Sequence, residues 1–320
     1  MRNKKIVVII PALNEENTLG FVIRDIKKIV KDAEIIVVND GSRDNTVNVA
    51  LEAGATKVIS HKRNKGLGVA FKTGINNALK IGADIIVSID ADGQFNPEDI
   101  PRLIQPILDE KSDMVTCSRF LHKKYLPKMP LIKRFGNKLF TKLVNIITRR
   151  RYTDTQCGFR AYSRKAALSM TLFGEYTYTQ EVFIDLISRG FRIIEVPCEV
   201  KGQRKGKSKL INNVFSYGVK ALLIILRTMR DYQPLKFFGF IGLVVFLVGF
   251  TSSLVLSIRW LIIHQIYPYM FLVYINVILL FFGFLLIILA FLADMFDRQR
   301  KLQEEILFRL KKEEFNGANK

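Results

Sequence analysis

The sequence IIVSIDADGQ at residues 85–94 decides the fold class, because an apolar run typical of a buried strand leads directly into two carboxylates. Side chains alternate along an extended backbone, so Asp90 and Asp92 can point the same way where this strand ends. Open α/β sheets bind ligands at the carboxyl ends of their strands. The pattern predicts an α/β sheet with a ligand site at this edge, whereas a lone Asp-x-Asp without such context is more often a solvated turn.

Two carboxylates one residue apart suit a divalent cation that is carried by a diphosphate. Mg²⁺ and Mn²⁺ prefer oxygen ligands and are often held by one or two carboxylates together with the phosphates of the substrate. We therefore predict that Asp90 and Asp92 hold Mg²⁺ or Mn²⁺. Gln94 follows them and is placed to touch the metal.

Residues 5–118 alternate short runs rich in Val and Ile with segments of helical pattern. This alternation predicts a mostly parallel sheet with helices on both faces. Polar residues follow the first, second and fourth apolar runs, which places them at one edge of that sheet. The expected strands are residues 5–10, 34–39, 57–60, 84–89 and 114–117, and the expected helices are residues 18–31, 45–53, 68–81 and 97–109.

The chain has 320 residues, of which 49% are hydrophobic, and the apolar excess lies near its end. Residues 235–263 and 269–293 are each longer than the roughly 20 residues that span a bilayer. We predict two transmembrane helices. Lys and Arg flank this pair and are absent from the joint at residues 264–268, so the positive-inside rule puts both flanks, and the soluble part of the chain with them, in the cytoplasm. The apolar run that ends at Pro11 is too short for a signal peptide.

The formal net charge of +20 limits the classes of binding partner that we expect for this chain. No helix-turn-helix, zinc-finger or RNA-binding signature accompanies the charge, so we expect membrane lipids and phosphorylated substrates rather than nucleic acid. Cys117, Cys157 and Cys198 are odd in number and lack metal-site spacing, which predicts reduced thiols in a cytoplasmic setting. We expect a catalytic domain at residues 1–209, an amphipathic interfacial helix at 210–233, two spans within 234–294, and a charged helical tail at 295–320.

Taken in order, the motifs resemble those of GT-A glycosyltransferases of family 2, and within them the polyprenyl-phosphate sugar transferases of the dolichol-phosphate mannosyltransferase type. The resemblance covers residues 4 to about 215. The segments that carry it are PALNE at 11–15, VNDGS at 38–42, NKGLG at 64–68, DADGQ at 90–94, SR at 118–119, DTQCGFR at 154–160, EVP at 195–197 and RKGKSK at 204–209.

This resemblance implies an inverting transfer of a sugar from a nucleotide sugar to a polyprenyl phosphate. GDP-mannose and dolichyl phosphate are the substrates most expected, with UDP-glucose and UDP-N-acetylglucosamine as alternative donors. It also implies roles for individual residues. The nucleotide would be held by Pro11, Ala12, Leu13, Glu15, Asp40, Gly66 and Asp90; the acceptor phosphate by Arg119, Arg134, Arg204 and Ser208; the sugar by Gln94 and Glu181; and Asp92, Gln94, Arg119 and Arg204 would act in catalysis.

Several alternatives stay open at the level of sequence. Asp40 could accept one N–H from uracil or two from guanine, so it does not distinguish the bases. The Gly66 segment could cradle phosphate or form a tight turn. Asp154 and Arg160 could pair with one another or bind the acceptor. An inactive membrane scaffold and a homo-oligomer are compatible with the sequence, whereas a processive synthase, which would need more spans, is not expected.

Overall fold

The computed structural model describes residues 4–122, 126, 131–171, 178–200, 230 and 233–317. It divides into two compact units, Met1–Val214 with Glu305–Lys320, and Phe215–Glu304. Each unit has its own architecture. The expected amphipathic helix at residues 210–233 lies almost entirely outside the described residues.

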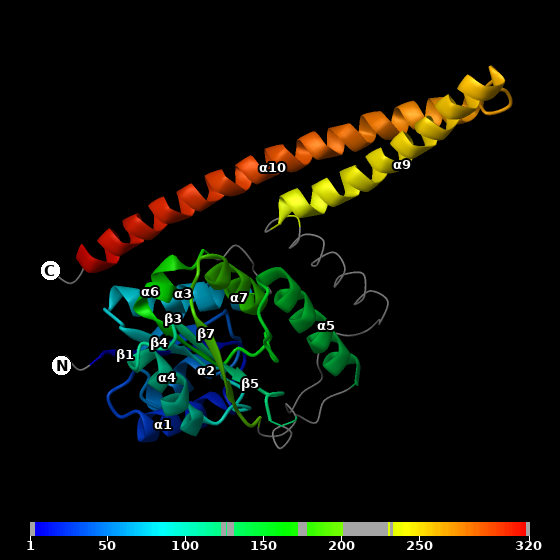
Figure 1. Cartoon of the computed structure of the whole chain (residues 1–320). Coiled ribbons are helices and arrows are strands. Elements are labelled where there is room, and N and C mark those ends of the chain that lie inside the picture. The colour runs from blue at the N-terminus through cyan, green and yellow to red at the C-terminus, as the bar shows by residue number, and fades with distance from the viewer. Residues whose placement is uncertain are drawn as a thin grey trace. The chain divides into compact units, whose positions relative to one another are not determined.

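The N-terminal unit is built on a seven-stranded sheet of order β3-β2-β1-β4-β6-β5-β7 (Figure 1). Neighbouring strands are parallel except for β6, which runs antiparallel to both β4 and β5. The mostly parallel α/β sheet expected from the sequence is confirmed, and the antiparallel strand is an addition to it. The strands are β1 (Ile6–Ala12), β2 (Glu34–Asn39), β3 (Lys57–Ser60), β4 (Ile85–Ser88), β5 (Met114–Ser118), β6 (Arg160–Ser163) and β7 (Ile193–Pro197).

Helices connect the strands and cover the sheet. All four helical segments expected in the first part of the chain are present, the last as a 3₁₀ turn that runs into a helix. In α1, Leu19, Ile23 and Ile26 lie on one face and are fully buried, which is the spacing of an amphipathic helix packed on a core. The helices of this unit are α1 (Leu19–Ile29), α2 (Thr46–Glu52), α3 (Leu67–Lys80), η1 (Pro97–Asp99), α4 (Ile100–Leu108), α5 (Leu131–Thr148), α6 (Arg164–Ser169) and α7 (Tyr178–Ser188).

The central strands are buried on both faces. Val7, Val8, Ile9 and Ile10 of β1 are all 0% exposed. Their continuous apolar sequence is the pattern of a parallel strand covered by helices on both sides. The polar residues of this region are therefore confined to the strand ends, where the chain leaves the core.

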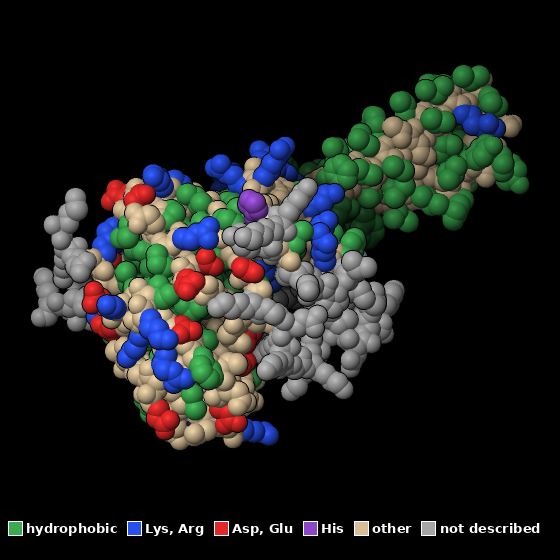
Figure 2. All heavy atoms as spheres, turned by 90° about the horizontal axis from the view of Figure 1, so that it is seen from below, with side chains coloured by type: hydrophobic (Ala, Val, Ile, Leu, Met, Phe, Trp, Pro, Cys, Tyr) green, Lys and Arg blue, Asp and Glu red, His purple; other side chains and the backbone are tan. Residues whose placement is uncertain are grey.

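Two long helices, α9 (Pro234–Ile263) and α10 (Met270–Gly317), follow the N-terminal unit in sequence. Both are long and apolar enough to cross a membrane by length and composition. In Figure 2 hydrophobic side chains predominate on the apolar part of this hairpin, and Ile262 and Phe271 are 74% and 72% exposed. An added Cβ at Gly283 of α10 would stand 2.6 Å from the Phe246 nitrogen of α9, so the two helices touch backbone to backbone there.

Helix α10 continues past the expected membrane span without a break, and its last turns belong to the N-terminal unit. Lys311 donates a hydrogen bond from Nζ to the Met170 carbonyl at 2.7 Å. Arg164 donates from Nη2 to the carbonyl of Phe315, whose side chain is 3% exposed. The end of the charged tail is therefore a packed part of the catalytic unit.

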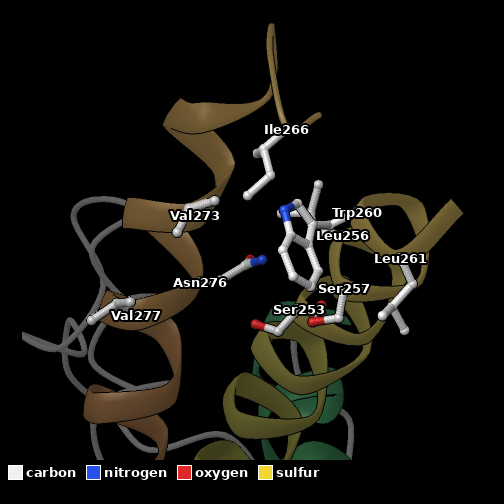
Figure 3. A pocket seen from close by; sticks show the side chains of 9 residues that line it. All are labelled: Ser253, Leu256, Ser257, Trp260, Leu261, Ile266, Val273, Asn276 and Val277. Atoms are coloured by element: carbon white, nitrogen blue, oxygen red, sulfur yellow. Dashed lines mark hydrogen bonds between the residues drawn. The ribbon is translucent and has the colours of Figure 1, made fainter. Parts of the chain in front are cut away.

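A pocket of about 400 Å³ lies between α9 and α10 near the turn that joins them (Figure 3). Its lining is mostly apolar, with Trp260 on one helix facing Asn276 on the other. The lining contains no carboxylate and no basic side chain. This pocket has none of the groups expected to handle a nucleotide sugar.

Candidate active site

A cleft of about 360 Å³ opens where β1, β2 and β4 end and α3 begins. All seven residues expected to hold the nucleotide lie in its wall, together with Asp92. The wall comprises Pro11, Ala12, Leu13, Glu15, Asp40, Asn64, Gly66, Leu67, Ala70, Asp90, Ala91 and Asp92. The tertiary structure thus gathers at one carboxyl edge residues that are up to 81 positions apart in the sequence.

The loops after β1 and β2 are tied together by side chains that bind backbone groups of the opposite loop. Asn14 donates its N–H to the Ser42 hydroxyl at 2.9 Å, and its own side-chain oxygen accepts from the Arg43 N–H at 2.8 Å. The Glu15 N–H donates to the Thr46 hydroxyl at 2.9 Å. These reciprocal bonds fix the cleft wall formed by PALNE and VNDGS.

Asp40 follows β2 and is 4% exposed. Its carboxylate accepts hydrogen bonds from the Lys65 N–H at 3.0 Å and the Gly66 N–H at 2.9 Å. The backbone can approach this closely because residue 41 is glycine. Gly41 has φ +79°, and an added Cβ there would lie 2.7 Å from the Asn64 nitrogen.

Gly66 of the NKGLG segment forms the turn that precedes α3. The Gly66 N–H is directed to the side chains of Asp40 and Asn64, at 2.9 Å each. Gly66 has φ 95° and immediately precedes the first residue of α3, Leu67. The segment forms a tight turn that contacts Asp40 through the Gly66 N–H, and it leads directly into the N-terminus of α3 in the cleft wall.

Asp90 and Asp92 both line the cleft just beyond β4. Asp90 lies against Gly158, where an added Cβ would stand 3.2 Å from the carboxylate Oδ1, so this position has little room for a side chain. Burial, and after it the negative charge of Asp90, holds the pKa of Tyr178 well above its ordinary value. The Gln94 N–H donates to Asp92 Oδ1 at 3.1 Å, which places Gln94 in the same turn.

The donor set of this turn fits a divalent cation that is bound together with a diphosphate. Within the described residues there is no cluster of three or more His, Cys, Asp or Glu side chains that could hold a metal ion by itself. Two carboxylates that line one cleft are the part of a Mg²⁺ or Mn²⁺ site that a protein supplies when substrate phosphates complete it. When bound, such an ion stabilises the charge of a departing diphosphate.

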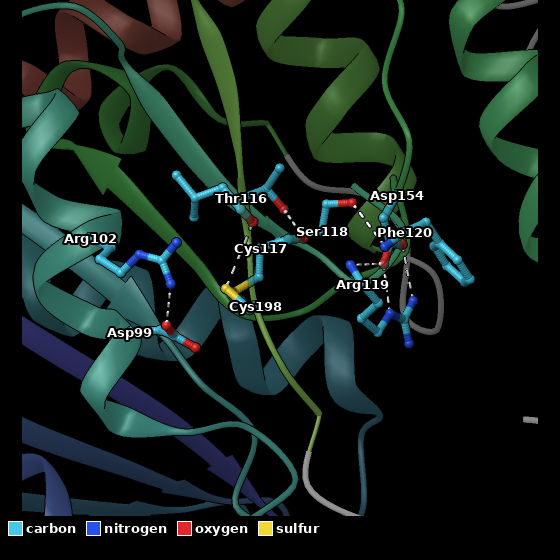
Figure 4. The surroundings of a disulfide bond; sticks show 10 residues. Asp99, Arg102, Thr116, Cys117, Ser118, Arg119, Phe120, Asp154 and Cys198 are labelled. Atoms are coloured by element: carbon cyan, nitrogen blue, oxygen red, sulfur yellow. Dashed lines mark hydrogen bonds and ion pairs between the residues drawn. A yellow bond between two sulfur atoms is a disulfide. The ribbon is translucent and has the colours of Figure 1, made fainter. Parts of the chain in front are cut away.

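Arg119, which follows β5, forms a bidentate ion pair with Asp154 (Figure 4). Its Nε lies 2.6 Å from Oδ2 and its Nη2 lies 3.0 Å from Oδ1, while Asp154 is fully buried. Burial by itself would lower the pKa of Arg119, but the hydrogen bond and charge of Asp154 raise it above its ordinary value. Arg119 is thus a permanent cation held in one orientation.

The pairing of Asp154 with Arg160, which the sequence left open, is wrong. Arg160 is 0% exposed and donates instead to the backbone carbonyls of Thr155 at 2.9 Å and Thr179 at 2.8 Å. Its guanidinium also stacks on the Phe183 ring at 4.7 Å. Arg160 points from β6 into the core, and Arg119 reaches Asp154 from the neighbouring strand β5.

Glu195 of β7 helps to build the site around Arg119 and Asp154, although the sequence analysis gave it no role. Its carboxylate accepts from the Thr153 N–H at 2.9 Å and from the Asp154 N–H at 2.8 Å. Burial raises the pKa of Glu195, although these hydrogen bonds favour its charged form. Glu195 therefore fixes the backbone that presents Asp154 to Arg119. The sequence did contain a signal for this role, because Glu195 belongs to the EVP motif at residues 195–197.

The expectation of three reduced thiols is wrong for two of them, because Cys117 and Cys198 form a disulfide (Figure 4). The parallel pairing of β5 with β7 brings together two residues that are 81 positions apart. Cys157 is free and buried, and burial followed by the charge of Asp154 raises its pKa to about 12. The Cys157 thiol is therefore not an activated nucleophile.

The remaining predicted site residues are only partly described. Arg134 lies on α5 and is half-buried, and Glu181 lies in the first turn of α7. Arg204 and Ser208 lie outside the described residues. The basic part of the expected acceptor site is therefore represented here by Arg119 and Arg134.

Comparison with known proteins agrees with this architecture. Residues 7–169 match the family model described as Glycosyl transferase family 2. The chain belongs to this family and is a glycosyltransferase.

Among its relatives are enzymes named for sugar transfer to polyprenyl phosphates. The UDP-N-acetylglucosamine–dolichyl-phosphate N-acetylglucosaminyltransferase of Methanococcus voltae is 33% identical over 246 residues, which cover 71% of this chain and 98% of that protein. The undecaprenyl-phosphate 4-deoxy-4-formamido-L-arabinose transferase of Yersinia enterocolitica is 29% identical, with coverage of 81% and 77%. Glycosyltransferase AglJ of Haloferax volcanii is 25% identical, with coverage of 80% and 82%.

A solved structure shares the fold. Glucosyl-3-phosphoglycerate synthase of Mycobacterium tuberculosis, in complex with Mn²⁺, UDP and phosphoglyceric acid, aligns with a TM-score of 0.55 and 24% identity. The alignment covers 71% of this chain and 78% of that chain. This likeness confirms the GT-A type of fold for the N-terminal unit.

Proposed function

We propose that this protein transfers a sugar, with inversion, from a nucleotide sugar to a polyprenyl phosphate. The single observation that carries the proposal is the cleft at the carboxyl edge of the sheet, where Asp40, Asp90 and Asp92 meet the PALNE loop. The names of the relatives support a lipid-phosphate acceptor, because two of them act on dolichyl or undecaprenyl phosphate.

A phosphate acceptor makes a general base unnecessary. A hydroxyl must lose a proton as it attacks, whereas a phosphate monoester has a second pKa of about 6 and is mostly dianionic near neutral pH. The difficulty is the repulsion between this anion and the diphosphate of the donor. An arginine held in one orientation reduces that repulsion and binds phosphate through two N–H groups. Arg119 is held in one orientation by Asp154, and we assign it to the acceptor phosphate. Arg134, Arg204 and Ser208 remain further candidates.

The proposal also covers the identity of the metal ion and the residues that bind the metal and the sugar. We assign the cation to Asp90 and Asp92, with Gln94 beside them in the turn and Glu181 as a candidate for sugar hydroxyls. Both Mg²⁺ and Mn²⁺ suit this donor set of oxygens.

The donor expected from the sequence was GDP-mannose, with UDP-glucose and UDP-N-acetylglucosamine as alternatives. One relative is named for a UDP-linked donor, and that relative is matched over 98% of its length. We therefore rank a UDP sugar above GDP-mannose.

We propose that the catalytic unit faces the cytoplasm and that α9 and α10 anchor it in the membrane. The distribution of Lys and Arg around the two spans supports this orientation. The Cys117–Cys198 disulfide opposes it, because structural disulfides are rare in a reducing cytoplasm. Counting free thiols in protein that is alkylated inside intact cells tests the point. Three free thiols agree with a reducing compartment, and one free thiol argues for an oxidising one.

The proposal is tested with the full chain in detergent, a panel of radiolabelled nucleotide sugars and a short polyprenyl phosphate. We expect label from one donor to enter the lipid phase only when both the lipid phosphate and a divalent cation are present. Nucleotide binding without any transfer would instead favour an inactive scaffold. Transfer to a lipid-free acceptor would overturn the assignment of the acceptor.

A further inference from the structure

The imidazole of His61 contacts Asp40 of the cleft wall, and the predicted reaction has no use for this histidine. It follows β3 directly, and its side chain is 8% exposed. Its Nδ1 lies 2.7 Å from Asp40 Oδ1, and its Nε2 lies 3.1 Å from the hydroxyl of Thr73 on α3. Because an ionised carboxylate only accepts hydrogen bonds, Nδ1 carries the hydrogen of the first contact.

Three donors converge on the Asp40 carboxylate. Oδ1 accepts from His61 Nδ1 and from the Lys65 N–H, and Oδ2 accepts from the Gly66 N–H. A carboxylate offers about four acceptor positions, two on each oxygen. Oδ1 is therefore saturated, and one position remains on Oδ2.

The single acceptor position that remains on Asp40 suits uracil better than guanine. Uracil presents one ring N–H, which a single carboxylate oxygen can accept. Guanine presents a ring N–H beside an amino N–H, and a carboxylate pairs with both only when each of its oxygens is available. In this cleft guanine would leave one donor without a partner, which costs about tenfold to a hundredfold in affinity.

We propose that His61 is a positioning residue that commits Asp40 to a single base contact, so that the cleft selects uridine over guanosine diphosphate sugars. This inference rests on the proposed function, since it assumes that the cleft binds a nucleotide. His61 touches Asp40 rather than the donor. Its loss therefore alters the recognition of the base and leaves the chemistry at the diphosphate intact.

The first test is the affinity of the full-length protein in detergent for UDP and for GDP, measured by calorimetry in the presence of Mn²⁺. We expect UDP to bind the wild-type protein at least about tenfold more tightly than GDP. Equal affinities, or tighter binding of GDP, would overturn the inference while leaving the proposed function intact. A folded protein that binds neither nucleotide would show that the proposed function itself is wrong.

Variants of His61 test its part in this selection. His61→Ala removes the donor to Oδ1, so we expect UDP to bind about tenfold more weakly and the ratio of UDP to GDP affinity to shrink. His61→Leu fills the same space without a donor and serves if the alanine variant does not fold. His61→Asn carries a side-chain N–H near the position of Nδ1 and should restore the preference for UDP.

Lys62→Ala is the matched control, because Lys62 is the next residue and is exposed. We expect it to bind both nucleotides as the wild type does. In transfer assays His61→Ala should raise the KM for the donor and leave kcat within about twofold. An unchanged UDP to GDP ratio in both His61→Ala and His61→Leu would overturn the role of His61, and so would a fall in kcat with an unchanged KM.

Discussion

The two units of this chain use the same apolar side chains in opposite ways. In the N-terminal unit, Val, Ile and Leu lie inside, and several buried polar groups, among them Asn39, Asp40 and Ser88, lie at the ends of strands. In the α9–α10 hairpin, large apolar side chains point outward along both helices, and the pocket between them has no charged group in its lining. The difference agrees with the proposed division of roles, in which the sheet edge carries the chemistry and the hairpin anchors the chain in a membrane.

Removal of the Asp92 carboxylate should have the largest effect. We expect Asp92→Ala to lower transfer by about a hundredfold to a thousandfold, because a preorganised group that stabilises transition-state charge is typically worth that much. Asp90→Ala should lower the transfer rate by a smaller factor than Asp92→Ala does. Transfer is measured with the full chain and the preferred donor, with and without chelator.

The exposed carboxylate Asp32 provides the control, and Asp32→Ala should leave transfer unchanged. Full activity of Asp92→Ala, or of the wild type in excess chelator, would remove the metal assignment.

Deletion of the hairpin sharpens the comparison between the units. A chain that ends at Gln233 should bind donor with metal and should use a short prenyl phosphate. It should lose about a hundredfold in rate on a long carrier in bilayers, because anchoring raises the effective concentration of a membrane substrate. Nucleotide binding and transfer to both acceptors are the measurements.

The deletion also removes the packed end of α10, so Phe315→Ala in the full chain is the control for stability. Truncation of this buried ring should cost about 3 to 5 kcal/mol and leave transfer to the long carrier intact. Equal activity of the shortened chain on long carriers in bilayers would end the anchoring role, and a shortened chain that is folded but binds no donor would contradict the division into two units.

Arg119→Ala should weaken use of the acceptor by about tenfold or more, because a charge-assisted hydrogen bond is worth roughly 1.5 to 3 kcal/mol. The substitution also leaves the buried Asp154 without its cation, which costs about 3 to 5 kcal/mol of stability. The double variant Arg119→Ala/Asp154→Asn removes the stranded charge and isolates the effect on function. Kinetics at varied lipid phosphate should show a raised KM.

Donor binding is the second readout for Arg119, and we expect it to be unchanged. A parallel loss of donor affinity would move Arg119 from the acceptor phosphate to the diphosphate. Arg204→Ala should behave as Arg119→Ala does, although its surroundings lie outside the described residues.

The smallest effect is expected at the contact between α9 and α10. Gly283→Ala forces a Cβ to within 2.6 Å of the Phe246 nitrogen and should destabilise the hairpin by about 1 to 3 kcal/mol. Gly239→Ala is matched to it, since its Cβ would meet the Ala290 Cβ at an ordinary 3.7 Å. Thermal unfolding in detergent should separate the two variants, while UDP affinity stays the same in both. A loss of UDP affinity in Gly283→Ala would mean that the hairpin contributes to the cleft.

Much of the fold could be predicted because its signals are local. The expected strands and helices of residues 5–118 all occur, with ends that differ by about two residues or fewer. The antiparallel strand β6 escaped prediction, since four residues between β4 and β5 in space carry no local sign of their direction. The position of His61 could have been predicted from the sequence, because His61 follows a strand whose end lies at the same edge of the sheet as Asp40.

The sequence by itself determined that the chain is an α/β glycosyltransferase with polar residues at the strand ends, followed by two long apolar helices. These features depend on periodicity and on the rule that parallel strands bring their carboxyl ends to one edge. Only the tertiary structure decided which side chains meet there. Arg119 pairs with Asp154, which is 35 positions away in the sequence, and His61 contacts Asp40, which is 21 positions away. Cys117 forms a disulfide with Cys198, which is 81 positions away. Such pairs are chosen by strand order and register, which no local pattern specifies, because their geometry exists only once the sheet has assembled.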